Sequence, residues 1–389
     1  MTRCDVLVAG AGPAGSALAA GLARSGARVI LLEAAHHPRP KACAEYASPR
    51  IVEELAGIGL APEAWQADAI GLTGMRMIAG RQSAMITYAD RRGARTAWGL
   101  DRTRFDARLA GHAADNGAEL VEGTRLAALE VAGGRVTGAT VRSGDGTART
   151  IGADLVVGAD GVRSTVARLT GVERPVRFPR RLGLVAHHEG DPELADHGEM
   201  HVGRGYYVGL APLPDGQLNV GMALPMNGRT PAAERFAAAL AGLPAVAARL
   251  AGRDRLTPIR GASPIGHRVS DVAGSGWLLV GDAAGFVDPF TGEGIHRALR
   301  SARAATAAII GSGDPSAAYR RERRAAFAAK ATLSWLVQGF LAVPPLLEHT
   351  LARLEERPNA ALRLGSALGD CRPATDALAP HALVEFLRP

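Results

Sequence analysis

The sequence predicts an α/β protein, because three short apolar segments each run into a glycine-containing turn and then into a helix pattern. These segments are residues 5–9, 154–157 and 277–280. Strands that alternate with helices in this way are typical of a largely parallel sheet with helices on both faces. Strand patterns between the second and third segments, and a helical pattern beyond residue 312, predict a second sheet and a helical C-terminal region.

The first segment carries the most information. Strand residues 5–9 lead into Gly10-Ala11-Gly12-Pro13-Ala14-Gly15, a helix over 16–25 and a second strand over 28–33 that ends in Glu33. The first glycine permits a tight turn, the second lets the backbone approach a pyrophosphate, and the third lets the helix pack closely on the strands. The helix N-terminus attracts phosphate, and the acid can accept hydrogen bonds from ribose hydroxyls. This pattern predicts a site for FAD or NAD rather than NADP; an ordinary strand–helix–strand unit with a glycine-rich turn is the alternative.

Two further segments repeat the pattern of a buried strand that ends where an acid lies beside a glycine. Residues 154–168 place Asp160-Gly161 at a junction of strand and helix, and residues 277–285 place Gly281-Asp282 at another. The chain then continues through Thr291-Gly292-Glu293-Gly294-Ile295 into an Ala- and Arg-rich helix. A single glycine-rich turn is weak support for a nucleotide site, so the order and spacing of all three segments matter.

In this order and spacing, the three segments resemble the flavoprotein hydroxylase superfamily, whose FAD-binding fold is of the glutathione-reductase type. Within it, the chain is most similar to the geranylgeranyl reductase-like branch. This closer resemblance is carried by the loop 291–295, the stretch 41–49 around Cys43, and the strand 205–212. It covers nearly the whole chain. It implies a Rossmann-like FAD-binding domain, an interleaved mixed β-sheet substrate domain and C-terminal helices.

The resemblance also implies roles for individual residues. Asp282 would bind ribitol hydroxyls, and the backbone N–H groups of Gly292 and Gly294 would face the N1/O2 edge of the flavin. Arg102 would lie near the phosphates, and Asp160 would serve both FAD and a transient reductant, NADH or NADPH. For these last two residues, a surface arginine and a plain helix cap are the alternatives. The full set expected at the cofactor is Gly10, Gly12, Pro13, Ala14, Gly15, Glu33, Arg102, Asp160, Gly161, Gly281, Asp282, Gly292, Gly294 and Ile295.

The same patterns divide the chain into interleaved parts. We expect the FAD-binding domain to use residues 1–64, 99–174 and 271–312, and the substrate domain to use residues 65–98 and 175–270. Within the substrate domain, Leu213-Pro214-Asp215-Gly216 predicts a hairpin turn. Residues 313–389 form the expected C-terminal helical region, which Pro344-Pro345 interrupts.

Composition excludes a disordered or collagen-like chain, because 47% of the residues are apolar and the 48 glycines follow no triplet period. The three cysteines, Cys4, Cys43 and Cys371, fit neither a disulfide framework nor a zinc site. This usage favours a reducing, cytoplasmic setting. No signal peptide and no uncharged apolar run of about 18 residues is visible, so we expect no transmembrane segment.

The net charge is +7, and most of it lies in residues 297–330, which carry eight basic and two acidic side chains. A solvated helix face explains this basic tract. Weak contact with a carrier protein or an anionic membrane surface is the alternative. No aromatic residue interrupts the densest part, residues 320–324, so we expect a small-molecule substrate and no nucleic-acid partner.

Two reactions compete for such a site. The Asp160-Gly161 segment favours a monooxygenase, whereas the 291–295 loop and the stretch around Cys43 favour a reductase of carbon–carbon double bonds. The Tyr-x-Trp-x-Phe-Pro pattern of the reductases is incomplete here, because Gly209 and Ala211 replace Trp and Phe. The motif of flavin halogenases is also missing. We therefore expect an FAD-dependent monooxygenase that uses NAD(P)H in natural product biosynthesis, on an aromatic or polyketide-like metabolite. The reductase and a non-catalytic flavin-binding protein are the alternatives.

The candidate catalytic residues are Glu45, as a base for a phenol, and Tyr207, on the strand expected over the flavin. Glu45 as a surface carboxylate is the alternative. Substrate contacts are expected from Cys43, Tyr46, Tyr206 and Gly209, although Cys43 also fits a small buried apolar position. No metal site is expected.

Overall fold

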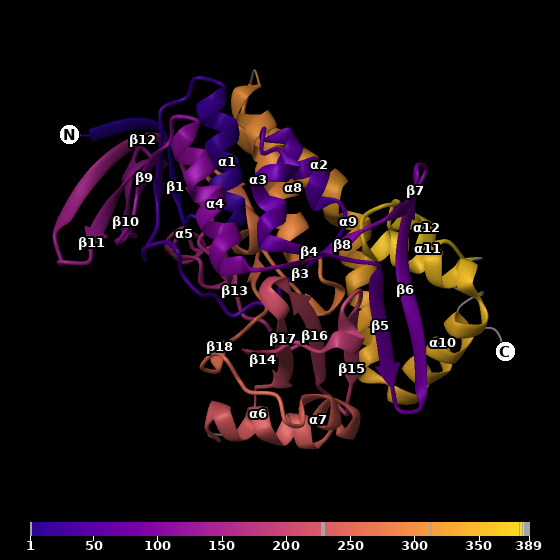
Figure 1. The fold of residues 1–389 in the computed structure, drawn as a ribbon. Helices are drawn as coiled ribbons and strands as arrows, with labels where there is room; N and C mark the ends of the chain where they lie inside the picture. The colour runs from indigo at the N-terminus through magenta and orange to yellow at the C-terminus, as the bar shows by residue number, and fades with distance from the viewer. Residues whose placement is uncertain (1, 227–229, 312, 381, 383, 385–389) are drawn as a thin grey trace.

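The computed structural model describes residues 2–226, 230–311, 313–380, 382 and 384 (Figure 1). Its first sheet has the order β10-β11-β12-β1-β2-β9, and β21 joins it beside β12 and pairs with β20. Strands β1, β2, β9, β12 and β21 are parallel, and β10 and β11 add an antiparallel extension. The bounds are β1 (Thr2–Ala9), β2 (Val29–Leu32), β9 (Glu119–Val121), β10 (Thr124–Ala132), β11 (Arg135–Ser143), β12 (Ala148–Gly158), β20 (Ala273–Gly274) and β21 (Trp277–Leu279).

The central strand β1 is buried on both faces, which is why its sequence pattern predicts it clearly. Val6 and Val8 face one apolar core, and Leu7 and Ala9 face another. A strand buried on both faces is a continuous apolar run rather than an alternating one. Helices around this sheet are α1 (Pro13–Arg24), α2 (Ile51–Gly57), α3 (Pro62–Trp65), α4 (Arg102–Asp115), α5 (Thr165–Leu169) and α8 (Gly294–Ile310).

The second sheet is mixed and has the order β18-β14-β17-β16-β15-β5-β6-β7, in which β15 and β5 are parallel. Its strands are β5 (Gly74–Ala79), β6 (Gln82–Asp90), β7 (Gly93–Arg95), β14 (Arg181–Glu189), β15 (Gly198–Val202), β16 (Tyr207–Leu213), β17 (Gln217–Pro225) and β18 (Arg260–Ala262). All of them lie within 65–98 and 175–270, while those of the first sheet lie within 1–64, 99–174 and 271–312.

Smaller elements join the two sheets and cover the second one. A three-stranded sheet, β3-β8-β4, lies between them, and β13 pairs with β19. Helices α6 and α7 pack on one part of the second sheet. The bounds are β3 (Tyr46–Ala47), β4 (Ala69–Leu72), β8 (Ala97–Leu100), β13 (Glu173–Arg174), β19 (Arg268–Val269), α6 (Ala232–Ala241) and α7 (Pro244–Leu250).

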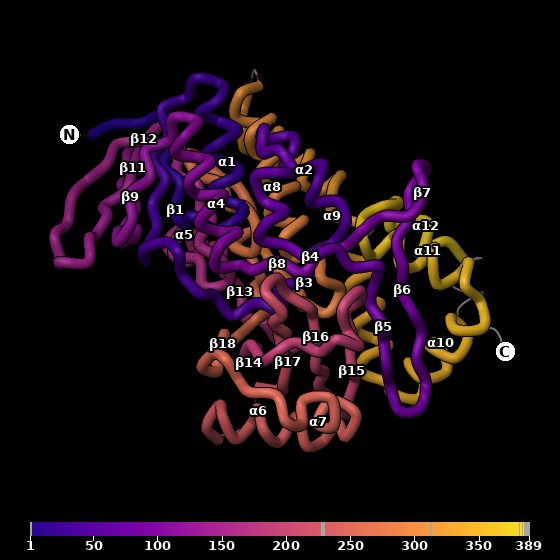
Figure 2. The backbone as a smooth tube through the Cα atoms, in the orientation of Figure 1, coloured from indigo at the N-terminus to yellow at the C-terminus, as the bar shows by residue number. Residues whose placement is uncertain are grey.

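The C-terminal helices are α9 (Pro315–Ala342), α10 (Pro344–Glu356), α11 (Pro358–Leu368) and α12 (Thr375–Leu378). A single non-helical residue, Val343 or Arg357, separates α9 and α10 from the proline that starts the next helix, because the residue before proline avoids the helical conformation. Figure 2 shows α10 and α11 beside β5 and β6, so segments far apart in the sequence are neighbours. Among the described residues, α9 alone has the length and composition to cross a membrane, and 33% of its apolar stretch is buried inside the protein.

The predicted fold class is confirmed: a parallel nucleotide-binding sheet, a mixed second sheet and C-terminal helices are all present. The predicted hairpin turn joins β16 to β17, and Asp215 adopts a positive φ of 61° there. The predicted interruption at Pro344-Pro345 lies between α9 and α10.

Gly15 provides a test of how closely α1 packs on the turn. A Cβ atom at Gly15 would lie 1.8 Å from the carbonyl oxygen of Gly10, whereas one at Gly111, in the middle of α4, would meet no atom within 4 Å. We therefore expect Gly15→Ala to lower the free energy of unfolding by about 1–3 kcal/mol or more, as overpacking does. Gly111→Ala should be neutral or stabilising, because alanine favours helix. Chemical denaturation of both apo-proteins measures the difference, and equal stability of the two would contradict this packing.

Candidate functional site

The turn between β1 and α1 forms an open cradle for an anion. No side chain caps α1; Gly12 occupies the N-cap position and Pro13 begins the first turn. A Cβ atom at Gly12 would meet only the guanidinium of Arg39, at 3.9 Å, so the backbone there faces open space. Uncapped N–H groups at a helix N-terminus bind phosphate. The turn therefore fits the pyrophosphate of a dinucleotide.

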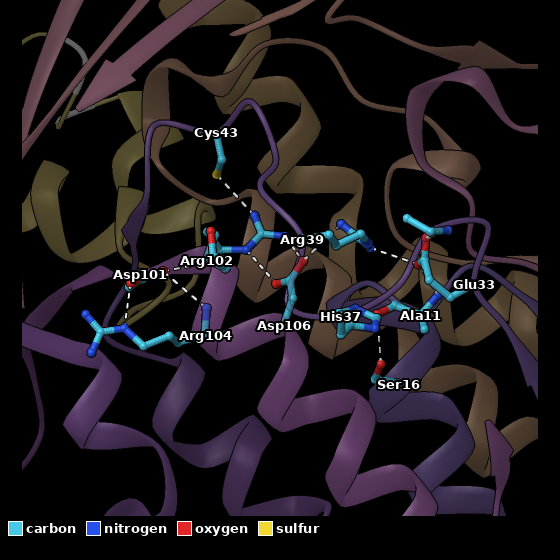
Figure 3. Close-up of polar contacts among 12 residues, drawn as sticks. Ala11, Ser16, Glu33, His37, Arg39, Cys43, Asp101, Arg102, Arg104 and Asp106 are labelled. Atoms are coloured by element: carbon cyan, nitrogen blue, oxygen red, sulfur yellow. Dashed lines mark hydrogen bonds and ion pairs between the residues drawn. The ribbon is translucent and has the colours of Figure 1, made fainter. Parts of the chain in front are cut away.

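Glu33 bounds the cradle at the end of β2. Its Oε2 atom accepts hydrogen bonds from the N–H of Ala11 at 3.1 Å and from Nη2 of Arg39 at 2.9 Å, and its Oε1 atom accepts from the N–H of Ala35 at 3.1 Å (Figure 3). A carboxylate has about four acceptor positions, so one is left for a ribose hydroxyl. Glu33 therefore fixes the turn and also fits the adenosine ribose.

Arg102 is joined to this cradle through buried ion pairs (Figure 3). Its Nε and Nη2 atoms donate to the carboxylate of Asp106 at 2.7 and 2.9 Å, and its Nη1 atom lies 3.1 Å from Sγ of Cys43. Nη1 of Arg39 lies 3.7 Å from the same carboxylate. Burial opposes ionisation of Asp106, but the Arg102 guanidinium outweighs it and holds the pKa of this carboxyl below its usual value. Arg102 thus connects the cradle to the stretch around Cys43.

The segment 281–294 offers polar groups to a flavin. The side chain of Asp282 makes no hydrogen bond to any described residue, and Asp282 is only partly buried. Gly281 and Gly292 adopt φ values of +60° and +66°, which favour glycine, and α8 begins at Gly294 without a side-chain cap. A free carboxylate for ribitol hydroxyls and an uncapped helix N-terminus for the anionic edge of a flavin are what FAD requires.

Asp160 and Gly161 lie beside this segment. The Oδ2 atom of Asp160 accepts from the N–H of Thr165 at 2.6 Å, whereas its buried Oδ1 atom has no partner among the described residues. Burial raises the pKa of this carboxyl. Asp160 therefore accepts from the first residue of α5, whose N-cap is Ser164, and keeps one acceptor without a partner among the described residues. Its role toward FAD and the reductant stays a prediction.

An apolar pocket lies between the second sheet and the loop 289–292, next to the groups that fit FAD. It encloses about 610 Å³ of space, including its open mouth. Side-chain hydroxyls of Tyr46, Tyr88 and Thr291 are the only polar side-chain groups among the described residues that line it. The complete lining is Ala44, Tyr46, Met75, Met77, Ile86, Tyr88, Met200, Gly209, Leu210, Ala211, Pro289, Phe290, Thr291, Gly292 and Leu368.

The two tyrosines form one hydrogen-bonded pair, with 2.8 Å between Oη of Tyr46 and Oη of Tyr88. One hydroxyl donates to the other, so the second hydroxyl proton has no acceptor among the described residues. Burial raises the pKa of Tyr46 well above its ordinary value, and burial also raises that of Tyr88. Both side chains therefore stay protonated at neutral pH, and one hydroxyl proton is not used within the pair.

A comparison of the sequence with protein families matches residues 3–332 to the family described as FAD binding domain. The chain belongs to this FAD-binding family. Its sequence is 33% identical over 324 residues to menaquinone reductase of Mycolicibacterium smegmatis, covering 80% of this chain and 78% of that protein. It is 31% identical over 324 residues to digeranylgeranylglycerophospholipid reductase of Methanosarcina acetivorans, covering 80% and 77%.

The fold of this flavoprotein is also similar to a solved structure, a geranylgeranyl bacteriochlorophyll reductase-like protein of Thermoplasma acidophilum. The TM-score is 0.81 with 22% sequence identity, and the match covers 99% of each chain. The resemblance inferred from the sequence is therefore confirmed: the protein is an FAD-dependent oxidoreductase similar to the geranylgeranyl reductases.

The structure brings some of the predicted substrate residues of this flavoprotein into the pocket and leaves others outside. Tyr46 and Gly209 line it. Cys43 lies one residue from the lining Ala44, with its sulfur toward Arg102. Tyr206 faces away, because its hydroxyl donates to the carbonyl of Ala239 in α6 at 3.1 Å. The structure places Tyr206 away from the pocket, contrary to the expectation of a substrate contact, because this residue lies just before β16 and its ring packs on the cluster that includes α6 and α7.

Tyr207 is buried beside the pocket but does not line it. Its hydroxyl donates to Oδ1 of Asp288 at 2.6 Å, and its ring packs edge-on against Phe290 with 5.0 Å between the ring centroids. The other carboxylate oxygen of Asp288 pairs with Arg181. We therefore assign Tyr207 to positioning of the 288–292 loop, instead of the catalytic role expected from the sequence.

Glu45 is buried rather than exposed, and its carboxylate is occupied by protein donors. Oε1 accepts from the N–H of Arg102 at 3.0 Å, and Oε2 accepts from Nδ2 of Asn219 at 2.5 Å. Nε2 of His187 lies 2.7 Å from Oε2, and this hydrogen bond raises the pKa of His187. Glu45 also adopts a φ of +57°. These contacts fix the bend between Cys43 and Tyr46, so Glu45 does not face the pocket as a free base.

Sequence reasoning did not identify several residues of the site. Met75 and Met77 of β5, Tyr88 and Met200 line the pocket, but no local sequence pattern places them there. Lys330 appeared only as one charge of the basic tract. These residues come from strands and helices that meet only in three dimensions.

Buried charges link residues 288–294, called here the flavin loop, to the C-terminal helices. Nζ of Lys330 lies 3.3 Å from Oε2 of Glu293 and 3.0 Å from Oδ1 of Asp370. Nδ1 of His296 lies 2.9 Å from the other oxygen of Asp370, and its Nε2 atom lies 3.7 Å from Glu54. Burial by itself would lower the pKa of His296, but the two carboxylates outweigh it and raise it to about 9. This histidine is therefore a cation at neutral pH.

The His296 pKa predicts a pH dependence of stability. A pKa raised above the unfolded value of about 6.5 contributes stability that is fully present below pH 6.5 and is lost as pH rises through about 9. We expect His296→Gln to flatten the fall in urea midpoint across this window. His36→Gln serves as the control, because the side chain of His36 is 76% exposed. Parallel pH curves for His296→Gln and the unmodified protein would contradict the assignment.

Proposed function

We propose that this flavoprotein is a reductase that saturates a carbon–carbon double bond in the isoprenoid chain of a lipid, such as a prenylated quinone. The apolar pocket beside the flavin groups is the observation that carries the proposal. Its walls are methionine, aliphatic and aromatic side chains, which suit a long hydrocarbon and offer few partners to a polar ring system. The names of the relatives, menaquinone reductase and digeranylgeranylglycerophospholipid reductase, point in the same direction.

The structure also alters the main sequence argument against this reaction. Gly209 and Ala211 are smaller than the Trp and Phe of the reductase pattern, and small residues by themselves would leave open room for a ring system. A Cβ atom at Gly209 would lie 3.3 Å from the methyl group of Met200, so the methionine fills the space that the glycine leaves. Flexible methionines adapt to irregular apolar ligands. The pocket therefore gains its narrow apolar wall from β5 and β15 instead of from aromatics on β16.

In this reduction, the residues of the site would have separate roles. The N–H group of Gly294 would hold the flavin edge, because the N–H of Gly292 already donates to the carbonyl of Pro289 at 3.0 Å. FAD, when bound in its reduced form, would supply the hydride. The hydroxyl pair of Tyr46 and Tyr88 supplies the proton that the second carbon of the double bond needs. Phe290 and Met77 exclude water around the reacting carbons.

Hydroxylation of an electron-rich metabolite is the second candidate. The Asp160-Gly161 segment, whose Oδ1 acceptor is unpartnered among the described residues, favours it because this segment supports reduced-nicotinamide use in hydroxylases. The two reactions differ in their use of oxygen, and this difference decides between them.

The reaction class is tested with a menaquinone that carries an unsaturated isoprenoid chain, and with a panel of phenols. We expect the reduced holoenzyme to add two hydrogens to the menaquinone chain under anaerobic conditions, and no labelled atom to enter any product under isotopically labelled oxygen gas. Mass spectrometry measures both results. Uptake of one labelled oxygen atom by a phenol, with no change in the isoprenoid chain, would favour the monooxygenase.

The role of the tyrosine pair is tested by Tyr46→Phe, which keeps the ring against Gly292 and removes the hydroxyl. Loss of a proton donor should lower kcat by about 10²–10⁴-fold, with little change in FAD content. Tyr206→Phe is the matched control and should leave kcat unchanged, because its hydroxyl binds the backbone of α6. Single-turnover rates measure the effect, and normal rates in Tyr46→Phe, in Tyr88→Phe and in the double variant would exclude this proton source.

A further inference from the structure

The solvent-facing side of α9 has an unusual composition. The exposed residues of this helix recur every three or four positions, so they lie in one line along its outer side. From residue 325 onward, this line and the start of the next helix contain no charge: the exposed residues are Ala325, Ala328, Thr332, Trp335, Gly339, Ala342, Val343 and Pro345. The exposed fractions of Trp335 and Val343 are 48% and 47%. Surface helices normally present polar and charged side chains to water. These exposed residues, called here the apolar face of α9, do not.

The same helix is basic at its other end. Arg324 and Arg321 lie on the same line, one and two turns before Ala328, and both are exposed. The side chain of Arg321 is 74% exposed and lies 4.0 Å from Glu322, the one acid in residues 320–324. Arg324 has no partner among the described residues. By contrast, Arg320 is held by Asp271, so only part of the basic tract is available to a partner.

The inner side of α9 fixes how the helix lies on the protein. Val337 and Leu341 pack on the cluster that contains Tyr46 and Phe290, so this side reaches the wall of the pocket. Lys330 donates to the carbonyls of Ala367 and Leu368 and pairs with buried carboxylates. Because these contacts hold α9 along its length, the helix lies on the body of the protein and does not cross a bilayer.

We propose that the outer face of α9 docks the protein on an anionic lipid surface. Trp335 and the small apolar residues around it would enter the interface between head groups and acyl chains, as in amphipathic helices that lie in the membrane plane. Arg321 and Arg324 would bind the head groups of anionic lipids. A second copy of this chain is a poorer occupant, because the copies would bring together basic surfaces of a protein whose net charge is +7.

The proposal goes beyond the proposed function and concerns how a lipid substrate is reached. The inner side of α9 borders the pocket cluster while its outer side lies on the lipid, so one helix separates the membrane surface from the site. Docking is measured without turnover, so a failure to bind lipid and a failure to reduce double bonds are observed separately.

The test is co-sedimentation of FAD-loaded protein with vesicles of phosphatidylcholine alone and of phosphatidylcholine mixed with phosphatidylglycerol. We expect binding to the mixed vesicles, little binding to phosphatidylcholine alone, and release by high salt. Trp335→Glu should lower the partition coefficient at least tenfold. Val131→Glu is the matched control, because it adds the same charge at a position that is 61% exposed on β10, in the first sheet. It should bind as the unmodified protein does.

A second variant tests the charges. Arg321→Glu combined with Arg324→Glu should remove the preference for anionic vesicles, by about fivefold or more for each arginine. FAD absorbance and thermal unfolding confirm that each variant is folded. The proposal fails if the protein ignores anionic vesicles, or if Trp335→Glu and Val131→Glu bind equally well. It also fails if light scattering shows a dimer that only Trp335→Glu separates, since a second copy would then cover this face.

Discussion

The buried carboxylate of Asp288 holds together the parts of the molecule that build the site. Its Oδ1 atom accepts from Tyr207 of β16 and from the N–H of Phe290, and its Oδ2 atom pairs with Arg181 of β14. Arg181 also donates to Gln338 of α9 at 3.0 Å. One side chain, 4% exposed, therefore joins the flavin loop to two strands of the second sheet and to the C-terminal helices. Breaking such a buried pair leaves an uncompensated charge, at a cost of about 3–5 kcal/mol.

The flavin loop is held from its other end by Glu293, which contacts Lys330 and Ser334 of α9. Buried ion pairs add little net stability compared with apolar packing, but they require one particular arrangement of their partners. Here that arrangement sets where Gly292 and Gly294 lie relative to the pocket wall. The position of the flavin edge and the shape of the apolar pocket are therefore fixed by the same buried charges.

The cofactor half of the site was predictable from the sequence because its requirements are local. A tight turn, a close approach to phosphate and an acid at a strand end each require a residue type at a fixed spacing, as in the segment 10–33. The residues that line the pocket follow no such local spacing in the sequence. Whether Tyr206 or Tyr207 faces inward depends on strand register, and the space at Gly209 depends on Met200 from the neighbouring strand. Tyr88 reaches Tyr46 from β6, which lies 42 residues away in the sequence.

Helix α9 shows a physical reason why faces cannot be assigned from polarity alone. Lys330, Ser334 and Gln338 recur every four residues and all point inward, where Glu293, Asp370 and Arg181 satisfy them. Trp335, from the opposite side of the same turns, points outward. The same inner side also carries Phe327, Leu333 and Leu341, so polar and apolar residues lie together on it and polarity does not separate the two faces. The buried carboxylates and Arg181 account for the polar residues of the inner side, whereas the apolar residues of the outer side need an environment other than water.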